Sequence, residues 1–84
     1  MNNVIQRTVS VTGSYAPLVA SSLIGSVTIS CPPTNAAMVY FLGDDGSDVP
    51  WVPGEWHWFN RIDLRDIQIK GTAGDKITIV GGTW

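Results

Sequence analysis

The chain has 84 residues, which is enough for a single domain with a small core. Five Lys and Arg residues against seven Asp and Glu residues give a net charge of −2, and no basic run is present to neutralise the phosphates of a nucleic acid. One cysteine, Cys31, and one histidine, His57, exclude an internal disulfide and argue against a structural zinc site.

The sequence carries no segment that is long and apolar enough to cross a membrane, and residues 1–4 lack the basic and apolar regions of a signal peptide. We therefore expect a protein that is made in a reducing cytoplasm and has neither a membrane nor a nucleic acid as partner. Small domains without disulfides or metals often gain stability by self-association. The four tryptophans agree with an associating protein, because large aromatic side chains are enriched where protein surfaces meet.

Alternating apolar and polar residues predict β-strands along most of the chain. The first predicted strand is Val4–Thr12, and one of its faces carries Ile5, Arg7, Val9 and Val11. Because this strand follows the N-terminus, residues 1–12 could act as an exchanged or docking strand that adds to the sheet edge of a neighbour. Val9 and Val11 are then candidates for interface contacts.

The segment Tyr15–Gly25 is ambiguous. Pro17 excludes a central strand position, and Leu18-Val19 or Leu23-Ile24 could form short edge strands. The sequence leaves open whether this segment is ordered.

Two further strands are predicted at Ser26–Cys31 and Ala37–Leu42. The second is apolar on both faces, so we expect it to be covered on both sides, either by a second sheet and a loop or by a neighbouring subunit. An acidic turn over residues 43–48 follows. The pair Pro53-Gly54 then favours a turn that leads into the strand Glu55–Phe59.

The C-terminal part is predicted to form a corner at Asn60–Leu64, a closing hairpin over Asp66–Val80 and a tail from Gly81. Six to seven short strands separated by turns predict an all-β fold. We expect one domain over residues 1–84, either a small antiparallel β-sandwich or a jelly-roll-like barrel.

The tryptophans are the main candidates for a binding site. Trp51, Trp56 and Trp58 lie close together in the sequence, and the last two point to the same side of the Glu55–Phe59 strand. If buried, they would pack one sheet or one protomer against the next, which the small size of the core favours. If exposed, they would form a flat platform of the kind that stacks on sugar rings. Trp84 could anchor the chain on a neighbour.

The sequence does not favour catalysis, a metal or a cofactor. His57 and Glu55 are two residues apart on one strand face, but no nucleophile stands in a recognisable motif beside them. The acidic turn Asp44–Asp48 lacks the ligand spacing of a calcium loop. We therefore expect a protein that is not an enzyme and that binds no metal or cofactor.

From Ser26 onward the order of elements resembles that of small structural proteins in tailed-bacteriophage genomes. The elements that carry the resemblance are Ser26–Ile29, Met38–Gly43, Pro53–Glu55 and Ile62–Ile79. The resemblance implies a compact β-sandwich that serves as a virion component and has no active-site residues. It implies most directly a head decoration or cement protein, often a trimer, that sits on the outer surface of the capsid and bridges neighbouring major capsid proteins.

Two other readings remain open. The same fold could belong to a head fibre, tail or connector component of the virion, which differs from decoration in copy number and location. Alternatively, the chain could be a carbohydrate-binding module that uses a tryptophan platform. Exposed tryptophans that respond to polysaccharide would favour that alternative.

Overall fold

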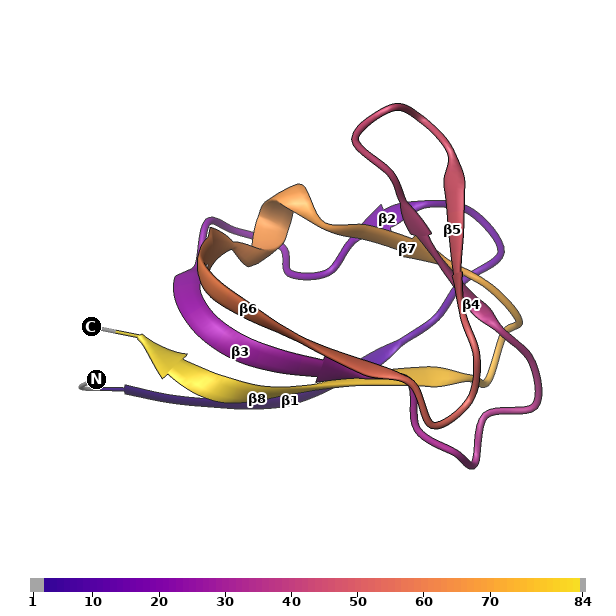
Figure 1. Ribbon diagram of the computed structural model, residues 1–84, viewed down its shortest axis with the longest axis horizontal. Helices are drawn as coiled ribbons and strands as arrows, with labels where there is room; N and C mark the ends of the chain where they lie inside the picture. Colours follow the sequence, from indigo (N-terminus) through magenta and orange to yellow (C-terminus); the bar gives the residue numbers. More distant parts are fainter. Residues whose placement is uncertain (1–2, 84) are drawn as a thin grey trace.

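The computed structural model describes residues 3–83 and contains two four-stranded antiparallel β-sheets packed face to face (Figure 1). Sheet A contains, in spatial order, β1 (Asn3–Ser10), β8 (Lys76–Thr83), β3 (Ile24–Ser30) and β6 (Trp56–Asp63). Sheet B contains, in spatial order, β2 (Ala16–Pro17), β7 (Gln68–Lys70), β4 (Val39–Leu42) and β5 (Asp48–Trp51). A single 3₁₀ turn among the described residues, η1 (Leu64–Asp66), leads from β6 to β7. The expected all-β sandwich is confirmed, and it is open and not closed into a barrel.

The core lies between the two sheets, where the inward-pointing side chains of both meet. Ile29, Ile77 and Ile79 of sheet A are fully buried, and Val39 and Ile69 reach them from sheet B. Removal of apolar surface from water is the main term that holds such a sandwich together, at roughly 25 cal/mol per Å². The remaining buried apolar residues are Ile5, Val11, Leu18, Val19, Val27, Cys31, Phe41, Trp51 and Leu64.

The described residues form eight strands, where the sequence predicted six to seven. β2 and β5 are short edge strands of sheet B, and they contain Pro17 and Pro50. Proline lacks the N–H that a central strand needs, so it is tolerated at an edge but weakens the sequence signal for a strand. The predicted corner at Asn60–Leu64 is also wrong, because β6 continues to Asp63.

The predicted closing hairpin is wrong in its pairing. β7 pairs with β2 and β4 in sheet B, whereas β8 pairs with β1 and β3 in sheet A. The turn that contains Gly74, whose φ is 98°, therefore connects the two sheets. The chain after β1 bonds to both ends of this turn, through Val11 N to Asp75 O (3.0 Å) and Gly71 N to Thr12 O (2.8 Å). Ile69 and Ile77 point into one core from opposite sheets, which is why the alternation resembles that of a hairpin.

The first strand is seated in the sheet of its own chain. β1 pairs with β8 along its whole length, from Asn3 opposite Thr83 to Ser10 opposite Lys76. Exchange or docking of residues 1–12 with a neighbour stays a prediction. The predicted tail from Gly81 is instead the end of β8, and a Cβ atom at Gly81 would lie 2.1 Å from the carbonyl oxygen of Ser26 on the adjacent strand.

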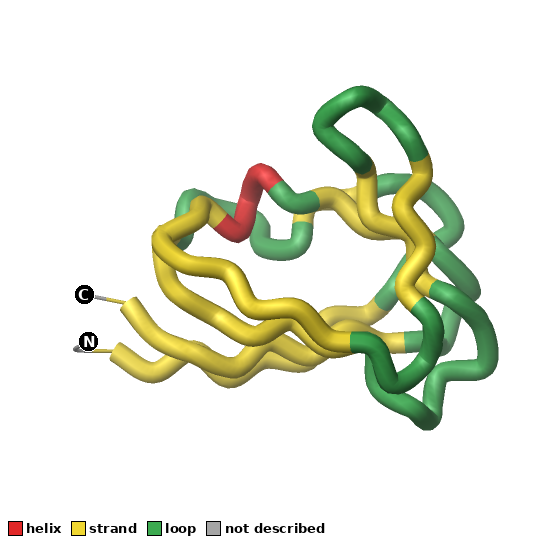
Figure 2. Tube along the Cα trace, viewed as in Figure 1, coloured by secondary structure: helices red, strands yellow, loops and turns green. Residues whose placement is uncertain are grey.

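Within the single chain Ala37–Leu42 is covered on one side only, and cover of the other side by a neighbouring subunit stays a prediction. Val39 and Phe41 are buried against sheet A, while Met38 and Leu42 are 40% and 38% exposed on the outside of sheet B. Figure 2 shows that the loops gather at the end of the sandwich opposite the paired ends of β1 and β8, and that the β4–β5 hairpin projects from the body.

Candidate functional site

The outward-pointing side of sheet A is the surface that best fits a binding role. We call it the outer face. It contains Val4, Gln6, Thr8 and Ser10 of β1, Lys76, Thr78 and Val80 of β8, Ile24, Ser26, Thr28 and Ser30 of β3, and Trp56, Trp58, Asn60 and Asp63 of β6. The strand register places Thr28 between Val80 and Trp58, and Ser30 between Thr78 and Trp56. Small hydroxyl side chains are thus the neighbours of the two indoles on the adjacent strand.

Trp56 and Trp58 are each 62% exposed on this face. Their outward direction follows from alternation along β6, because His57 and Phe59 point to the inside of the sandwich. Burial of these two tryptophans in the core of their own chain is therefore wrong. Val80, which is 53% exposed, lies one strand beyond Thr28 and extends the apolar area across β8.

The central rows of the outer face carry no charge. Its two ionised side chains lie at the margins of the face: Lys76, with Nζ 3.4 Å from Ser10 Oγ, and Asp63, which pairs with Ile24. Isolated exposed apolar residues are ordinary on protein surfaces, but a contiguous uncharged area with two exposed tryptophans is typical of an interaction site. Sheets that face water usually carry polar and charged residues on that side.

Two of the predicted interface candidates lie in the core instead. Trp51 is 5% exposed, and its ring stacks on Phe41 with a centroid distance of 3.8 Å and an interplanar angle of 17°. Val11 is 3% exposed, because it follows β1 into the space between the sheets. These two predictions are wrong, since neither side chain presents a contact surface. Val9 is half-buried against the core, and Trp84 lies outside the described residues.

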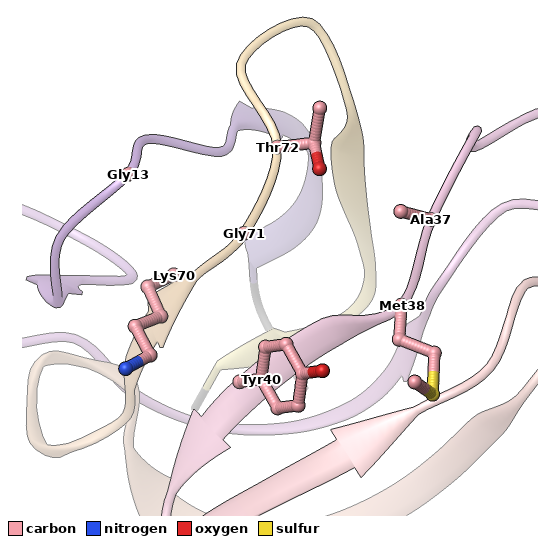
Figure 3. A pocket seen from close by; sticks show the side chains of 7 residues that line it. All are labelled: Gly13, Ala37, Met38, Tyr40, Lys70, Gly71 and Thr72. Atoms are coloured by element: carbon pink, nitrogen blue, oxygen red, sulfur yellow. The ribbon is translucent and has the colours of Figure 1, made fainter.

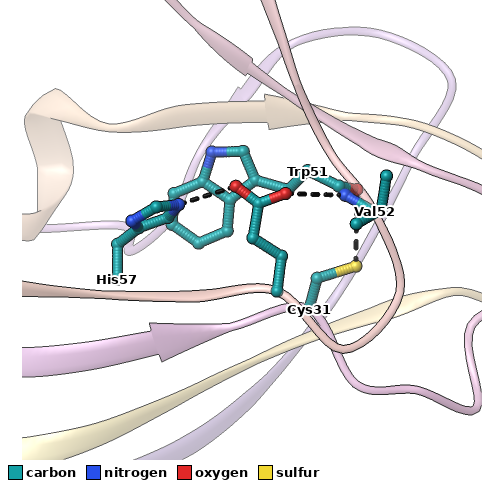
Figure 4. A network of polar contacts seen from close by, with 5 residues as sticks. Cys31, Trp51, Val52 and His57 are labelled. Atoms are coloured by element: carbon teal, nitrogen blue, oxygen red, sulfur yellow. Dashed lines mark hydrogen bonds and ion pairs between the residues drawn. The ribbon is translucent and has the colours of Figure 1, made fainter.

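Glu55 and His57 form a polar clasp at the edge of the sandwich (Figure 4). Glu55 Oε2 lies 2.6 Å from His57 Nε2, and Glu55 Oε1 accepts a hydrogen bond of 3.0 Å from the amide of Val52. The His57 ring meets Trp51 edge-on at 4.7 Å. The hydrogen bonds from His57 and from Val52 lower the pKa of Glu55 below its usual value. Both carboxylate oxygens accept hydrogen bonds within the chain, so the pair fastens the β5–β6 loop beside Trp51.

A depression of about 330 Å³ lies on the outside of sheet B, between Tyr40, Met38 and the Gly71-Thr72 segment (Figure 3). The ammonium group of Lys70 points away from Thr72 and Met38. It lies 3.5 Å from Asp48 Oδ2 and 4.7 Å from the centroid of the Tyr15 ring. Ligand sites usually bring several polar groups to one point. The polar groups of this depression do not converge, so it is a weak candidate.

Carboxylate hydrogen bonds make the stability of the fold sensitive to acid. Hydrogen bonds from Tyr15 to Asp48, from His57 to Glu55, and from Ser22 to Asp63 lower the pKa of each carboxyl group. A lowered pKa in the folded state adds stability above the unfolded-state value of about 4, and this stability is lost as the pH falls through the folded value. Partial burial first, and then the bond to Asp48, raise the pKa of Tyr15 to about 12.

We therefore expect the free energy of unfolding to decline below about pH 4, and again between about pH 10 and 12 as the unfolded chain releases the Tyr15 proton. Urea unfolding at a series of pH values measures both limbs. Asp63→Asn should lower stability at pH 7 and make the acid limb shallower, because Asp63 also accepts the amide protons of Leu23 and Arg65. An unchanged midpoint of the wild type down to pH 2.5 would contradict the acid limb.

The carboxylate of Asp45 in the acidic turn accepts hydrogen bonds from within the same turn. Asp45 Oδ1 accepts hydrogen bonds from Ser47 N (3.0 Å) and Ser47 Oγ (2.6 Å), which lower the pKa of Asp45. Within residues 3–83, the His, Cys, Asp and Glu side chains form no group of three or more that could hold a metal ion. The same part of the chain contains no helix with the length and apolarity of a membrane span.

Sequence reasoning identified the two exposed tryptophans but missed the rest of the outer face. Period-two alternation does not distinguish Thr28, Ser30, Thr78 and Val80 from the outward residues of any other strand. The available signal was the lack of charge at Thr28, Ser30, Thr78 and Val80, which is unusual for a sheet side that faces water.

Comparisons with protein-family models, with curated proteins and with solved structures find no match to this chain.

Proposed function

We propose that this chain is a non-enzymatic structural protein of a bacteriophage virion, and that it decorates the capsid by binding the lattice of major capsid proteins. The observation that carries the proposal is the outer face of sheet A, with Trp56 and Trp58 each 62% exposed on a surface whose central rows are uncharged. Aromatic side chains supply much of the affinity of protein interfaces, because each buries a large rigid area.

The small size of the chain fits this role. A cement protein stabilises the head by adding contact area across joints between coat subunits, and many modest contacts suffice when they are repeated over a lattice. The resemblance of residues 26–79 to phage structural proteins points to the same role. Self-association, with a trimer favoured, is part of the proposal, because a trimer would present several copies of the outer face at once.

The absolute copy number of the polypeptide in purified virions of its source, measured by quantitative mass spectrometry, tests this function. Hundreds of copies in simple ratio to the major capsid protein are expected for decoration. A handful of copies would instead indicate a head fibre, tail or connector component. Absence from the virion would refute a virion role altogether.

A carbohydrate-binding module is the second candidate, and exposure of Trp56 and Trp58 on one strand face favours it specifically. Such a module would stack sugar rings on the indoles and bond their hydroxyls to neighbours such as Thr28 and Ser30. Titration with polysaccharides separates the two candidates. A saturable change in tryptophan fluorescence would support sugar binding, whereas an unchanged spectrum, together with high copy number in virions, supports decoration.

A further inference from the structure

The edge strands of the two sheets differ in how well they are protected from pairing with another chain. Short length, proline and bulges all discourage such pairing. The edges of sheet B are β2, which has two residues and contains Pro17, and β5, which contains Pro50. One edge of sheet A is β6, which has a bulge where Asn60 and Arg61 lie opposite Ser26. These three edges are thus blocked by their own backbone.

β1 is the other edge of sheet A and has none of these features. It pairs with β8 from Asn3 to Ser10 without a register shift, and among residues 3–83 no strand pairs with its other side. Val11, the residue after β1, donates its N–H to Asp75 O (3.0 Å), on the side of β8. Successive residues of a strand direct their backbone groups to alternate sides. The residues whose N–H and C=O groups point to the open edge are therefore Val4, Gln6, Thr8 and Ser10.

The charge of Arg7 restricts how a second copy of β1 could pair with this edge. Arg7 is exposed on the inner side of β1, opposite Ile79, and such a charge discourages indiscriminate pairing. Two antiparallel registers use the open-edge groups and overlap over most of β1, one centred on Arg7 and one on Gln6. The first places two arginines directly opposite each other, which is destabilising. The second avoids this, and Lys76 lies beyond the end of its overlap.

In the register centred on Gln6, the side chains that meet across the join are compatible. Val4, which is 79% exposed in the single chain, lies opposite Thr8 of the second copy and can contact its methyl group. The two Gln6 amides meet at the two-fold axis, and an amide both donates and accepts hydrogen bonds. Arg7 lies opposite Ile5 of the second copy. The two arginines are then diagonal neighbours, about 7–8 Å apart, and both are exposed, so their long side chains can point apart.

We propose that a second copy of this chain binds the open edge of β1, antiparallel, about a two-fold axis at Gln6. The two copies of sheet A then form one sheet with both outer faces on the same side, and β6 with Trp56 and Trp58 lies at each end. This inference rests on the proposed function for its role, and gives the self-association a two-fold form in place of the trimer that the resemblance implies. An edge contact is small, so we expect a Kd between about 10 μM and 1 mM for the free protein.

Charge substitutions at Gln6 test the position of the two-fold axis. Sedimentation equilibrium of the wild type should show a monomer–dimer equilibrium. Gln6→Lys and Gln6→Glu should each weaken the dimer about fivefold, because each places like charges opposite each other. An equimolar mixture of the two should recover wild-type pairing, which unfolded chains could not do. Val52→Lys is the matched control, since it adds the same charge to an exposed loop beside the opposite edge of sheet A, and it should pair like the wild type.

Thr8→Pro tests the backbone pairing. The N–H of Thr8 points to the open edge, so proline removes hydrogen bonds across the join but none to β8. Dimers of Thr8→Pro should be lost at concentrations where Thr8→Ala still forms them. The urea midpoint should fall less for Thr8→Pro than for Val9→Pro, because the N–H of Val9 points to β8.

A wild type that stays monomeric up to about 1 mM, or that forms a trimer, would overturn this inference. So would a dimer that Gln6→Lys leaves unchanged, as exchange of residues 1–12 predicts, because an exchanged strand keeps Gln6 opposite Val80. Capsid co-sedimentation tests the proposed function separately. A monomer that binds capsids would leave the proposed function standing, whereas a dimer that binds none would overturn the function and leave the pairing.

Discussion

Replacing both exposed tryptophans, in Trp56→Ala/Trp58→Ala, is expected to weaken capsid binding severely while the protein stays folded. Each indole is 62% exposed in the free chain, so its truncation removes little of the buried core and costs about 1 kcal/mol of stability at most. At an interface the same truncation would remove two central aromatic contacts, each worth about 2 kcal/mol or more. The affinity for capsids should therefore fall by a factor of hundreds.

Co-sedimentation with capsids, together with far-UV circular dichroism and urea unfolding of the free variant, measures the two effects separately. Met38→Ala is a suitable control, because Met38 is a large apolar residue that is 40% exposed on the outside of sheet B, away from the outer face. It should bind as the wild type does. Undiminished capsid binding by the double tryptophan variant would show that another surface makes the contact.

Trp51→Ala is expected to have the opposite result, a large loss of stability. Trp51 closes the open edge of the sandwich, where it stacks on Phe41 at 3.8 Å, lies parallel to Phe59 at 6.4 Å and meets His57 edge-on at 4.7 Å. Truncating a buried aromatic side chain of this size costs about 3–5 kcal/mol. A domain of this length has a total of only about 4–13 kcal/mol, so a substantial unfolded fraction is expected at 25 °C.

Equilibrium urea unfolding followed by circular dichroism tests this expectation. Trp51→Phe should retain the stack with Phe41 and lose about half as much stability or less, since it keeps an aromatic ring in the cavity. Trp51→Ala with a wild-type midpoint would show that the edge can collapse around the gap. Of the three tryptophans within eight positions, Trp51 is thus expected to stabilise the fold, and Trp56 and Trp58 to bind the capsid. Comparing Trp51→Ala with Trp56→Ala/Trp58→Ala distinguishes these two roles.

The alternation of apolar and polar residues predicts the direction of many side chains in this protein. The assignment of Trp56 and Trp58 to one side of a strand and of Glu55 and His57 to the other could be made from period two, and the 2.6 Å contact between Glu55 and His57 confirms it. Alternation also located most of β1, β3 and β8. It could not reveal β2 and β5, because a proline removes the local signature of a strand without preventing an edge position.

Which strands pair with each other could not be predicted from the local residue pattern. Residues 66–80 have the alternation and the glycine turn of a hairpin, yet their two strands belong to different sheets. A strand pairs with the neighbours that best bury its apolar side. For β8 those neighbours are β1 and β3, which both lie within the first 30 residues. β6 also has a β-bulge at Asn60 and Arg61, opposite Ser26, which local pattern could not predict. It depends on Ser26 Oγ, which donates to Asn60 Oδ1 and accepts from Arg61 N, 34 and 35 residues away in the sequence.

The sequence by itself determined an all-β domain, the two sides of its main strands and the absence of a run of basic residues, because period-two alternation and charge order are local properties. The tertiary structure alone decided which of Trp51, Trp56 and Trp58 are buried. Trp51 lies under the clasp of Glu55 and His57, whereas Trp56 and Trp58 stand on a sheet side that nothing in the described chain covers. Burial depends on which sheet packs on which face, and that choice is made by contacts between segments far apart in the sequence.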